Sequence, residues 1–378
     1  MRIKLIPLLF AAVVLAGSWT SCKHSTSPNT DTTHKKCDTC INDTSHHPCD
    51  TCNKPCDTCN INQDSAAHAF IWKEFTIPSE ANLNGVWIFG PNDMIIVGDR
   101  LWHFDGAIFS PIEAVNNTHH SSMDGGLSGF NIFAFSKTDY WLVSGSIAFH
   151  TSDGKYFDDN RKGAVNACWG TSSNDMYFVG NAGHIFHYDG TNFADMTSNT
   201  TKDIRKVWGT SHNDVWAGGL NRSTGVSVLL HYDGNAWAEI NLSDLGQFGC
   251  ANCDGVSAVW TIDSTVNHHV VYVGGSFFYR RTDNGIWTND GDNVGNKLSG
   301  GGYAGLIGIR GNNSSDIMCV SGWGFAAHWN GKTWKRYDEI YNPGNSNFIT
   351  NAMHYTGNTA CMVGFKVGQS WMAVGTRK

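Results

Sequence analysis

The 378-residue sequence has little charge, and that charge is not basic. Charged residues make up 16% of the chain and the net charge is −7, which excludes the basic excess that a nucleic-acid-binding protein needs. Motifs for a nucleophile elbow, a phosphate loop or c-type haem attachment are also missing. In contrast, 42 glycines and 12% aromatic residues disfavour a helical bundle and favour strands. With 41% hydrophobic residues the chain can bury a core, which excludes global disorder.

The N-terminal segment reads as an export signal. Two basic residues precede an apolar run, Leu5 to Gly17, that is too short to span a bilayer as a helix. Residues 1–21 are therefore predicted to be a secretory signal. Cys22 follows small residues in a pattern that resembles a relaxed bacterial lipobox, which implies a lipidated Cys22 and an outer-membrane or cell-surface lipoprotein. Ordinary cleavage, with Cys22 unmodified and the protein secreted, is the alternative.

Residues 22–69 are predicted to be a tether. They are rich in Ser, Thr, Asn, Asp and His and have few large apolar groups, so they cannot form a core alone. The tetrapeptide CDTC occurs three times in this segment, at Cys37, Cys40, Cys49, Cys52, Cys56 and Cys59. Outside the cytoplasm each pair is expected to form a local disulfide. Zinc binding by the same cysteines and a redox role are the alternatives.

From about residue 70 onward one pattern recurs. Copies begin near Gly85, Phe130, Val165, Lys206, Val259, Ile307 and Thr350. Each complete copy has four short strand-like runs, and its clearest versions carry an Asn-Asp turn and an Asp-Gly turn, which are hairpin signals. Four strands joined by tight turns describe one blade of a β-propeller.

The last copy stops after three strands. Residues 70–77, FIWKEFTI, resemble the fourth strand of the other copies, so this segment is predicted to complete the C-terminal blade. The predicted fold class is all-β: a seven-bladed β-propeller over residues 70–378, with four-stranded blades and closed by the N-terminal strand in the last blade.

The VWGTSxNDVW and HYDGxxW signatures resemble the propeller repeats of secreted proteins from Bacteroidota-like and Ignavibacteria-like bacteria. The resemblance covers most of the chain and implies the fold. It says little about function, because propellers carry many activities.

Strands alternate in direction within a blade, so the blade-to-blade and second-to-third connections emerge on one face. The long insertions are predicted to crowd this face, which makes it the expected binding face. Its candidate residues are His119, His120, Asp124 and Tyr303. Cys250 and Cys253, in one of the insertions, are candidates for a further local disulfide.

Several other residues are predicted to be structural. The histidines of the HYDG turns, His187 and His231, recur from blade to blade. Cys168, Cys319 and Cys361 lie in strand patterns and are expected to be buried. No cofactor is expected. No metal is expected either, except under the alternative in which the CDTC cysteines bind zinc.

The predicted function is a noncatalytic surface or secreted scaffold that binds a protein or a glycan through the face rich in insertions. One alternative is a polysaccharide-acting enzyme, hydrolase or lyase, with carboxylates at the central channel. Another is a redox or metal module built on the CDTC units.

Overall fold

The structure is a computed structural model. The residues that it describes all lie within one compact unit, Asp57–Lys378. They are 68–77, 83–98, 100–112, 131–145, 147–153, 156–158, 165–221, 223–242, 255–264, 268–275, 278–283, 285–289, 305–340 and 348–378. Within these ranges, no helix has the length and hydropathy needed to cross a bilayer.

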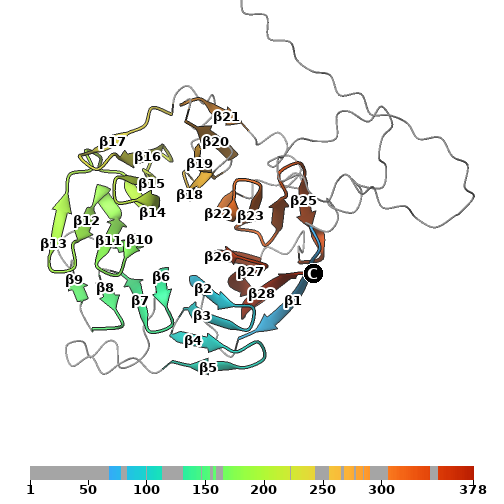
Figure 1. Ribbon diagram of the computed structural model, residues 1–378. Helices are drawn as coiled ribbons and strands as arrows, with labels where there is room; N and C mark the ends of the chain where they lie inside the picture. Colours follow the sequence, from blue (N-terminus) through green and yellow to red (C-terminus); the bar gives the residue numbers. More distant parts are fainter. Residues whose placement is uncertain are drawn as a thin grey trace, which may run out of the picture. The chain divides into compact units, whose positions relative to one another are not determined.

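Seven four-stranded antiparallel sheets are arranged in a ring, as predicted (Figure 1). Residues of the innermost strands line a small space at its centre, the central channel. The first strand of each sheet lies innermost. From inner to outer strand, the first blade is β2 (Gly85–Gly90), β3 (Asp93–Val97), β4 (Leu101–Phe104), β5 (Phe109–Pro111), and the second is β6 (Asn131–Ser136), β7 (Asp139–Ser144), β8 (Ile147–His150), β9 (Tyr156–Asp158). The third is β10 (Val165–Ser172), β11 (Asp175–Gly180), β12 (Ile185–Tyr188), β13 (Phe193–Met196), and the fourth is β14 (Asp203–Ser211), β15 (Asp214–Leu220), β16 (Ser227–Tyr232), β17 (Trp237–Glu239). The fifth is β18 (Ala258–Ser264), β19 (His268–Gly274), β20 (Phe278–Thr282), β21 (Trp287–Asn289), and the sixth is β22 (Leu306–Asn313), β23 (Asp316–Ser321), β24 (Ala326–Trp329), β25 (Trp334–Tyr337). Two short 3-10 helices, η1 (Asn181–Gly183) and η3 (Asp338–Ile340), follow β11 and β25.

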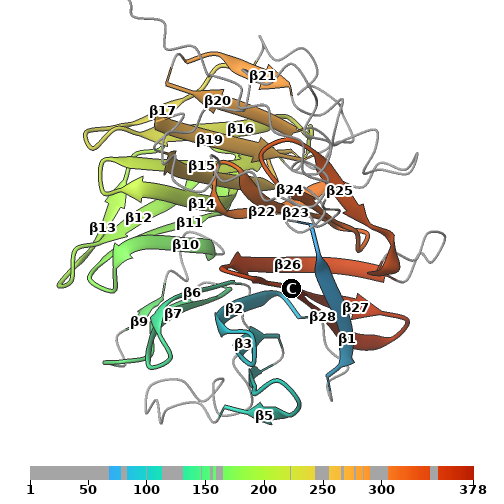
Figure 2. The same cartoon turned by 45° about the vertical axis from the view of Figure 1, so that its right-hand side comes forward.

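The seventh blade joins the two ends of the propeller. It consists of β26 (Phe348–Thr356), β27 (Thr359–Lys366), β28 (Gln369–Arg377) and, as its outer strand, β1 (Phe70–Thr76). All seven residues of β1 pair with β28, from Phe70 opposite Arg377 to Thr76 opposite Trp371. The predicted closure is confirmed, and Figure 2 shows β1 running along the edge of β28. The edge of β28 therefore carries a partner strand instead of unpaired N–H and C=O groups.

The recurring Asp-Gly turn fixes the outer hairpin of the blades that carry it. In the third blade, Asp189 Oδ1 accepts hydrogen bonds from the backbone N–H groups of Thr191 (2.8 Å) and Asn192 (2.7 Å). Gly190 follows with a φ of +89°, a conformation that favours glycine. This is the physical basis of the Asp-Gly signal in the sequence.

The Trp-Gly pair of the innermost strands sets the spacing between blades. Trp169 of β10 packs against Gly209 of β14, where a Cβ atom would lie 2.6 Å from the indole. Gly311 of β22 receives Trp260 of β18 in the same way, again at 2.6 Å. Glycine in one blade therefore makes room for the tryptophan of the blade before it.

Candidate binding site in the central channel

The innermost strands share a three-residue pattern. Its seven copies are Gly85-Val86-Trp87, Asn131-Ile132-Phe133, Ala167-Cys168-Trp169, Lys206-Val207-Trp208, Ala258-Val259-Trp260, Gly308-Ile309-Arg310 and Ala352-Met353-His354. The middle residue is buried in every copy. The first position holds Gly, Ala or Asn except in the fourth blade, where it is Lys206. The third position is aromatic in five blades, but Arg310 and His354 replace the aromatic residue in the last two.

Third-position residues from five blades contact one another in a continuous series around the channel. His354 stacks on Trp87 (ring centroids 4.3 Å apart), Trp87 packs against Phe133 (4.9 Å), and Phe133 packs against Trp208 (5.7 Å). The guanidinium carbon of Arg310 lies 3.9 Å from the centroid of Trp208, a cation–π contact. We call these five residues the aromatic layer. Lys206 precedes Trp208 by two residues, so it lies on the side of the layer from which the innermost strands begin.

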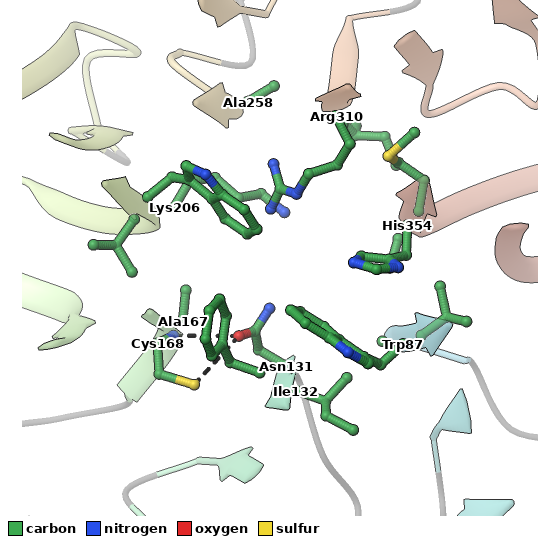
Figure 3. Close-up of a pocket in the computed structure, with 18 of the residues that line it drawn as sticks. Trp87, Asn131, Ile132, Ala167, Cys168, Lys206, Ala258, Arg310 and His354 are labelled. Atoms are coloured by element: carbon green, nitrogen blue, oxygen red, sulfur yellow. Dashed lines mark hydrogen bonds between the residues drawn. The ribbon is translucent and has the colours of Figure 1, made fainter. Parts of the chain in front are cut away.

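Two cations share this part of the channel. In Figure 3, Arg310 extends into the channel and Lys206 lies on the wall across from it. Both side chains are enclosed by the channel walls while part of each still contacts solvent. Burial and the charge of Arg310 lower the pKa of Lys206 to about 8, and burial lowers the pKa of Arg310 to about 9. Both groups therefore remain mainly protonated at pH 7.

The positive charge of these cations is not balanced by the described lining residues. None of those residues is an aspartate or glutamate, and neither Lys206 nor Arg310 forms an ion pair within the described part of the chain. Arg310 Nη1 donates to the carbonyl oxygens of Ile309 (2.7 Å) and Val259 (3.2 Å), whereas its buried Nε has no partner there. The carboxylates that a polysaccharide-cleaving channel site needs are likewise not found among these lining residues.

The other polar groups of the channel have defined states. Asn131 Oδ1 accepts a hydrogen bond from the backbone N–H of Cys168 (3.2 Å), and the amide nitrogen of Asn131 points into the channel (Figure 3). His354 Nδ1 accepts from the backbone N–H of Ile88 (3.3 Å). Burial, reinforced by the charge of Arg310, lowers the pKa of His354 to about 3, so this imidazole is neutral at pH 7.

The cavity enclosed by these residues is small. Its volume is about 50 Å³, whereas pockets for drug-sized ligands measure roughly 300–1,000 Å³. The space suits a few water molecules or one small functional group. It does not suit a sugar ring or a nucleotide.

An exposed apolar patch lies at one face of the sixth and seventh blades. Trp323, in the connection between β23 and β24, is 56% exposed, Ile349 at the start of β26 is 45% exposed, and Val367 between β27 and β28 is 57% exposed. The backbone N–H of Thr350 donates to the carbonyl oxygen of Gly322 (2.8 Å), which joins the backbone preceding Trp323 to the backbone following Ile349. We call these three residues the Trp323 patch. It lies on the face of second-to-third and blade-to-blade connections, where binding is predicted.

A histidine–aspartate pair recurs near the opposite face. Five blades carry it, with nitrogen–oxygen distances of 2.6–2.9 Å: His103–Asp93, His150–Asp139, His187–Asp175, His231–Asp214 and His328–Asp316. His187 and His231 lie in β12 and β16, and each binds an aspartate of its own blade, which agrees with the structural role predicted for them. The sequence analysis did not identify their aspartate partners, although each stands at the start of a second strand.

Histidine, lysine or arginine side chains of the following blade reach several of these pairs. His212 Nδ1 lies 3.1 Å from Asp175 Oδ1, and Arg377 of the last blade binds Asp316 of the sixth. Asp175, His187 and His212 place possible metal-ligating atoms within 4.8 Å of one another. The first and second blades form the same Asp–His hydrogen bond without a second histidine among the described residues, so this group is explained as a structural link.

The pairs predict an acid-labile fold. Burial alone would raise the pKa of Asp214 and Asp316. Hydrogen bonds from His231 and Thr210 to Asp214, and from His328 and Arg377 to Asp316, act with further neighbours to outweigh burial and hold both pKa values below the usual range. Depressed carboxyl pKa values give stability that is complete above the unfolded value, about 3.9, and is lost as the pH falls through the folded values. We expect the free energy of unfolding to decrease below about pH 4.

We expect Asp214→Asn to lower the free energy of unfolding by about 1–3 kcal/mol at pH 7 and to make its decrease below pH 4 less steep, as measured by urea titrations at several pH values. A steeper drop in the variant would contradict this account.

Most residues predicted as functional lie outside the described residues. These are His119, His120, Asp124, Tyr303, Cys22, Cys37, Cys40, Cys49, Cys52, Cys56, Cys59, Cys250 and Cys253. Cys168, Cys319 and Cys361 are free and buried, as expected, and burial raises the pKa of each thiol. Lys206 and Arg310 were not singled out by the sequence analysis. Aligning the seven copies would have identified them, because each breaks the residue type of its position.

The fold and the channel define a closed seven-bladed propeller with a cationic centre. No family model matches the sequence, and no curated protein matches it. Among solved structures, the chain is similar to YCF48 bound to D1 peptide (13% identity, TM-score 0.56, covering 81% of this chain and 97% of that one) and to YCF48 from Cyanidioschyzon merolae (14%, 0.56, 80% and 98%).

It is also similar to the extracellular domain of the putative one component system BT4673 from B. thetaiotaomicron (12% identity, TM-score 0.55). That match covers 81% of this chain but 40% of the other. Identities this low support the shared propeller fold and nothing finer.

Proposed function

We propose that this chain is an exported, noncatalytic propeller that binds a protein through the face bearing the Trp323 patch. Export is supported by the signal-like residues 1–21, and among the structural neighbours one is an extracellular domain and one is bound to a peptide. Lipidation of Cys22 and disulfides within the CDTC units and between Cys250 and Cys253 belong to the same proposal. They would hold the propeller on a stiffened tether at the cell surface.

The observation that carries the proposal is the exposure of three large apolar side chains, Trp323, Ile349 and Val367, on one face of the sixth and seventh blades. Exposed tryptophan is a frequent energetic centre of protein interfaces, and apolar neighbours extend the surface that a partner can cover. The cations of the channel, which no described lining residue balances, would also favour a partner that carries a negatively charged group. The partner chemistry that suits this face is a protein segment with apolar side chains and a carboxylate.

Selection from a random-peptide library displayed on phage tests the proposal. We expect the propeller to enrich peptides with aromatic or aliphatic residues. We expect Trp323→Ser to weaken their binding at least tenfold in fluorescence polarisation, because truncating a buried interface anchor costs about 2 kcal/mol or more. Ile108→Ser is the matched control, since Ile108 is 62% exposed in a third-to-fourth connection on the opposite face.

Failure to enrich any peptide, or equal binding to both variants, would contradict a protein-binding face. A parallel assay of polysaccharides for released reducing sugar addresses the noncatalytic part of the proposal. Turnover by the wild-type protein would overturn that part.

A further inference from the structure

We propose that Lys206, Arg310 and Asn131 form a site in the central channel that binds one carboxylate group. The site includes Arg310 of the aromatic layer and two residues on the strand-start side of that layer, from the second and fourth blades. All three donors line the same cavity, and none of its described lining residues is acidic.

The hydrogen-bonding capacity of the channel is unbalanced in favour of donors. Arg310 uses Nη1 on two carbonyl oxygens, and its buried Nε is left without a partner among the described residues. Lys206 contributes an ammonium group, and the amide nitrogen of Asn131 points into the same space because its oxygen is taken by Cys168. A carboxylate accepts hydrogen bonds at both oxygens, and it is the group that guanidinium binds in bidentate geometry.

The cavity volume narrows the ligand class. A space of about 50 Å³ takes a planar group of about three heavy atoms and excludes sugars, nucleotides and other large anions. The aromatic layer forms one boundary of this space. A carboxylate there would lie against the edge of the layer, with the cations of Lys206 and Arg310 beside it.

The positions of the two cations argue against a purely structural role. At the first position of the pattern the other six blades carry Gly, Ala or Asn, and at the third position five blades carry an aromatic residue. Six blades therefore form without a cation at the first position, and six form without one at the third. Arg310 is partly compensated by the Trp208 ring and two carbonyl oxygens, whereas Lys206 has no anionic partner among the described residues, so an anion bound beside them would offset the cost of enclosing both charges.

The carboxylate can come from a free small molecule or from an acidic side chain of a bound protein. The second source rests on the proposed function, and the first does not. Both place the same group against Lys206 and Arg310, so one set of probes serves both.

Titration with defined carboxylates tests the site. Sodium acetate and the blocked tripeptide acetyl-Gly-Glu-Gly-amide are the probes, acetyl-Gly-Gln-Gly-amide is the neutral control, and sodium chloride holds the ionic strength constant. We expect acetate to raise the melting temperature of the wild-type protein at pH 7 through its binding to the folded state. We expect Lys206→Met and Arg310→Met each to weaken acetate binding at least tenfold, whereas Lys73→Met, an exposed change on β1, leaves it unchanged.

The outcomes separate the two sources and the two proposals. Binding of acetate alone supports a site for free carboxylates, and binding of the glutamate tripeptide as well supports a site open to side chains. An equal response to chloride and acetate, or an acetate response that both Met variants retain, overturns the proposal. Peptide binding that depends on Trp323 is measured in a separate experiment, by fluorescence polarisation. Loss of acetate binding in Lys206→Met with capture intact therefore leaves the proposed function standing.

Discussion

Deleting residues 1–77 is expected to abolish cooperative folding of the propeller, whereas deleting residues 1–66 is expected to leave it intact. The longer deletion removes β1 and leaves the edge of β28 unpaired. It also removes the buried ring of Phe70, and losing one such ring typically costs about 3–5 kcal/mol. Because whole domains are stable by only about 5–15 kcal/mol, this loss together with that of the strand pairing takes most of the available stability.

Contacts outside the strand ladder add to this effect. His68 Nδ1 lies 2.9 Å from His328 Nδ1, and the hydroxyl of Tyr337 donates to the carbonyl oxygen of His68 (3.0 Å). Trp371 Nε1 donates to Glu74 Oε2 (2.8 Å). The segment from His68 to Thr76 therefore ties the last blade to the sixth blade as well as to β28.

Thermal unfolding followed by circular dichroism measures the difference between the two deletions. A synthetic peptide of residues 68–77 should restore a cooperative transition to the longer deletion, because an extended peptide can add a strand to an open sheet edge. Equal melting temperatures for the two deletions would show that β1 does not close the ring.

Gly209→Ala is expected to destabilise the protein by about 1–3 kcal/mol or more, the range for overpacking a well-packed core. A Cβ atom at this position would lie 2.5 Å from the carbonyl oxygen of Asp214 and 2.6 Å from the indole of Trp169. The first contact is with backbone, so a change of rotamer cannot relieve it. The third and fourth blades would have to move apart or bend.

Gly90→Ala provides the matched control for Gly209→Ala. Gly90 ends β2, and the nearest atom to its Cβ would be Asp93 Cβ at 3.8 Å, an ordinary contact. Urea unfolding should place the midpoint of Gly209→Ala clearly below that of Gly90→Ala. Similar midpoints would mean that the blades do not depend on the close approach at Gly209.

The sequence was sufficient to predict the blades and their closure because both follow from local signals. Asp189-Gly190 specifies a turn through hydrogen bonds within four residues, and residues 70–77 match the fourth strands of other copies. Such signals depend on neighbours in the chain and can be read without knowing the fold. The number of blades then follows from counting copies.

The channel site could not be predicted in the same way. Lys206 and Arg310 are 104 positions apart in the sequence and meet only because the fourth and sixth blades face one channel. Neither residue lies in a motif with a known function. From the sequence alone, a lysine or arginine in a predicted strand is assigned to the solvent-exposed face. Only the comparison of equivalent positions across the seven copies, combined with ring closure, shows that both cations point to the same place.

The melting temperature of Lys206→Met at pH 7, with and without acetate, tests most directly whether the channel cations serve binding at a cost to stability. We predict that the variant melts about 2–4 °C above the wild-type protein in chloride, the shift expected from roughly 1 kcal/mol, and that acetate does not raise it further. A variant that melts below the wild-type protein and still responds to acetate would contradict the account.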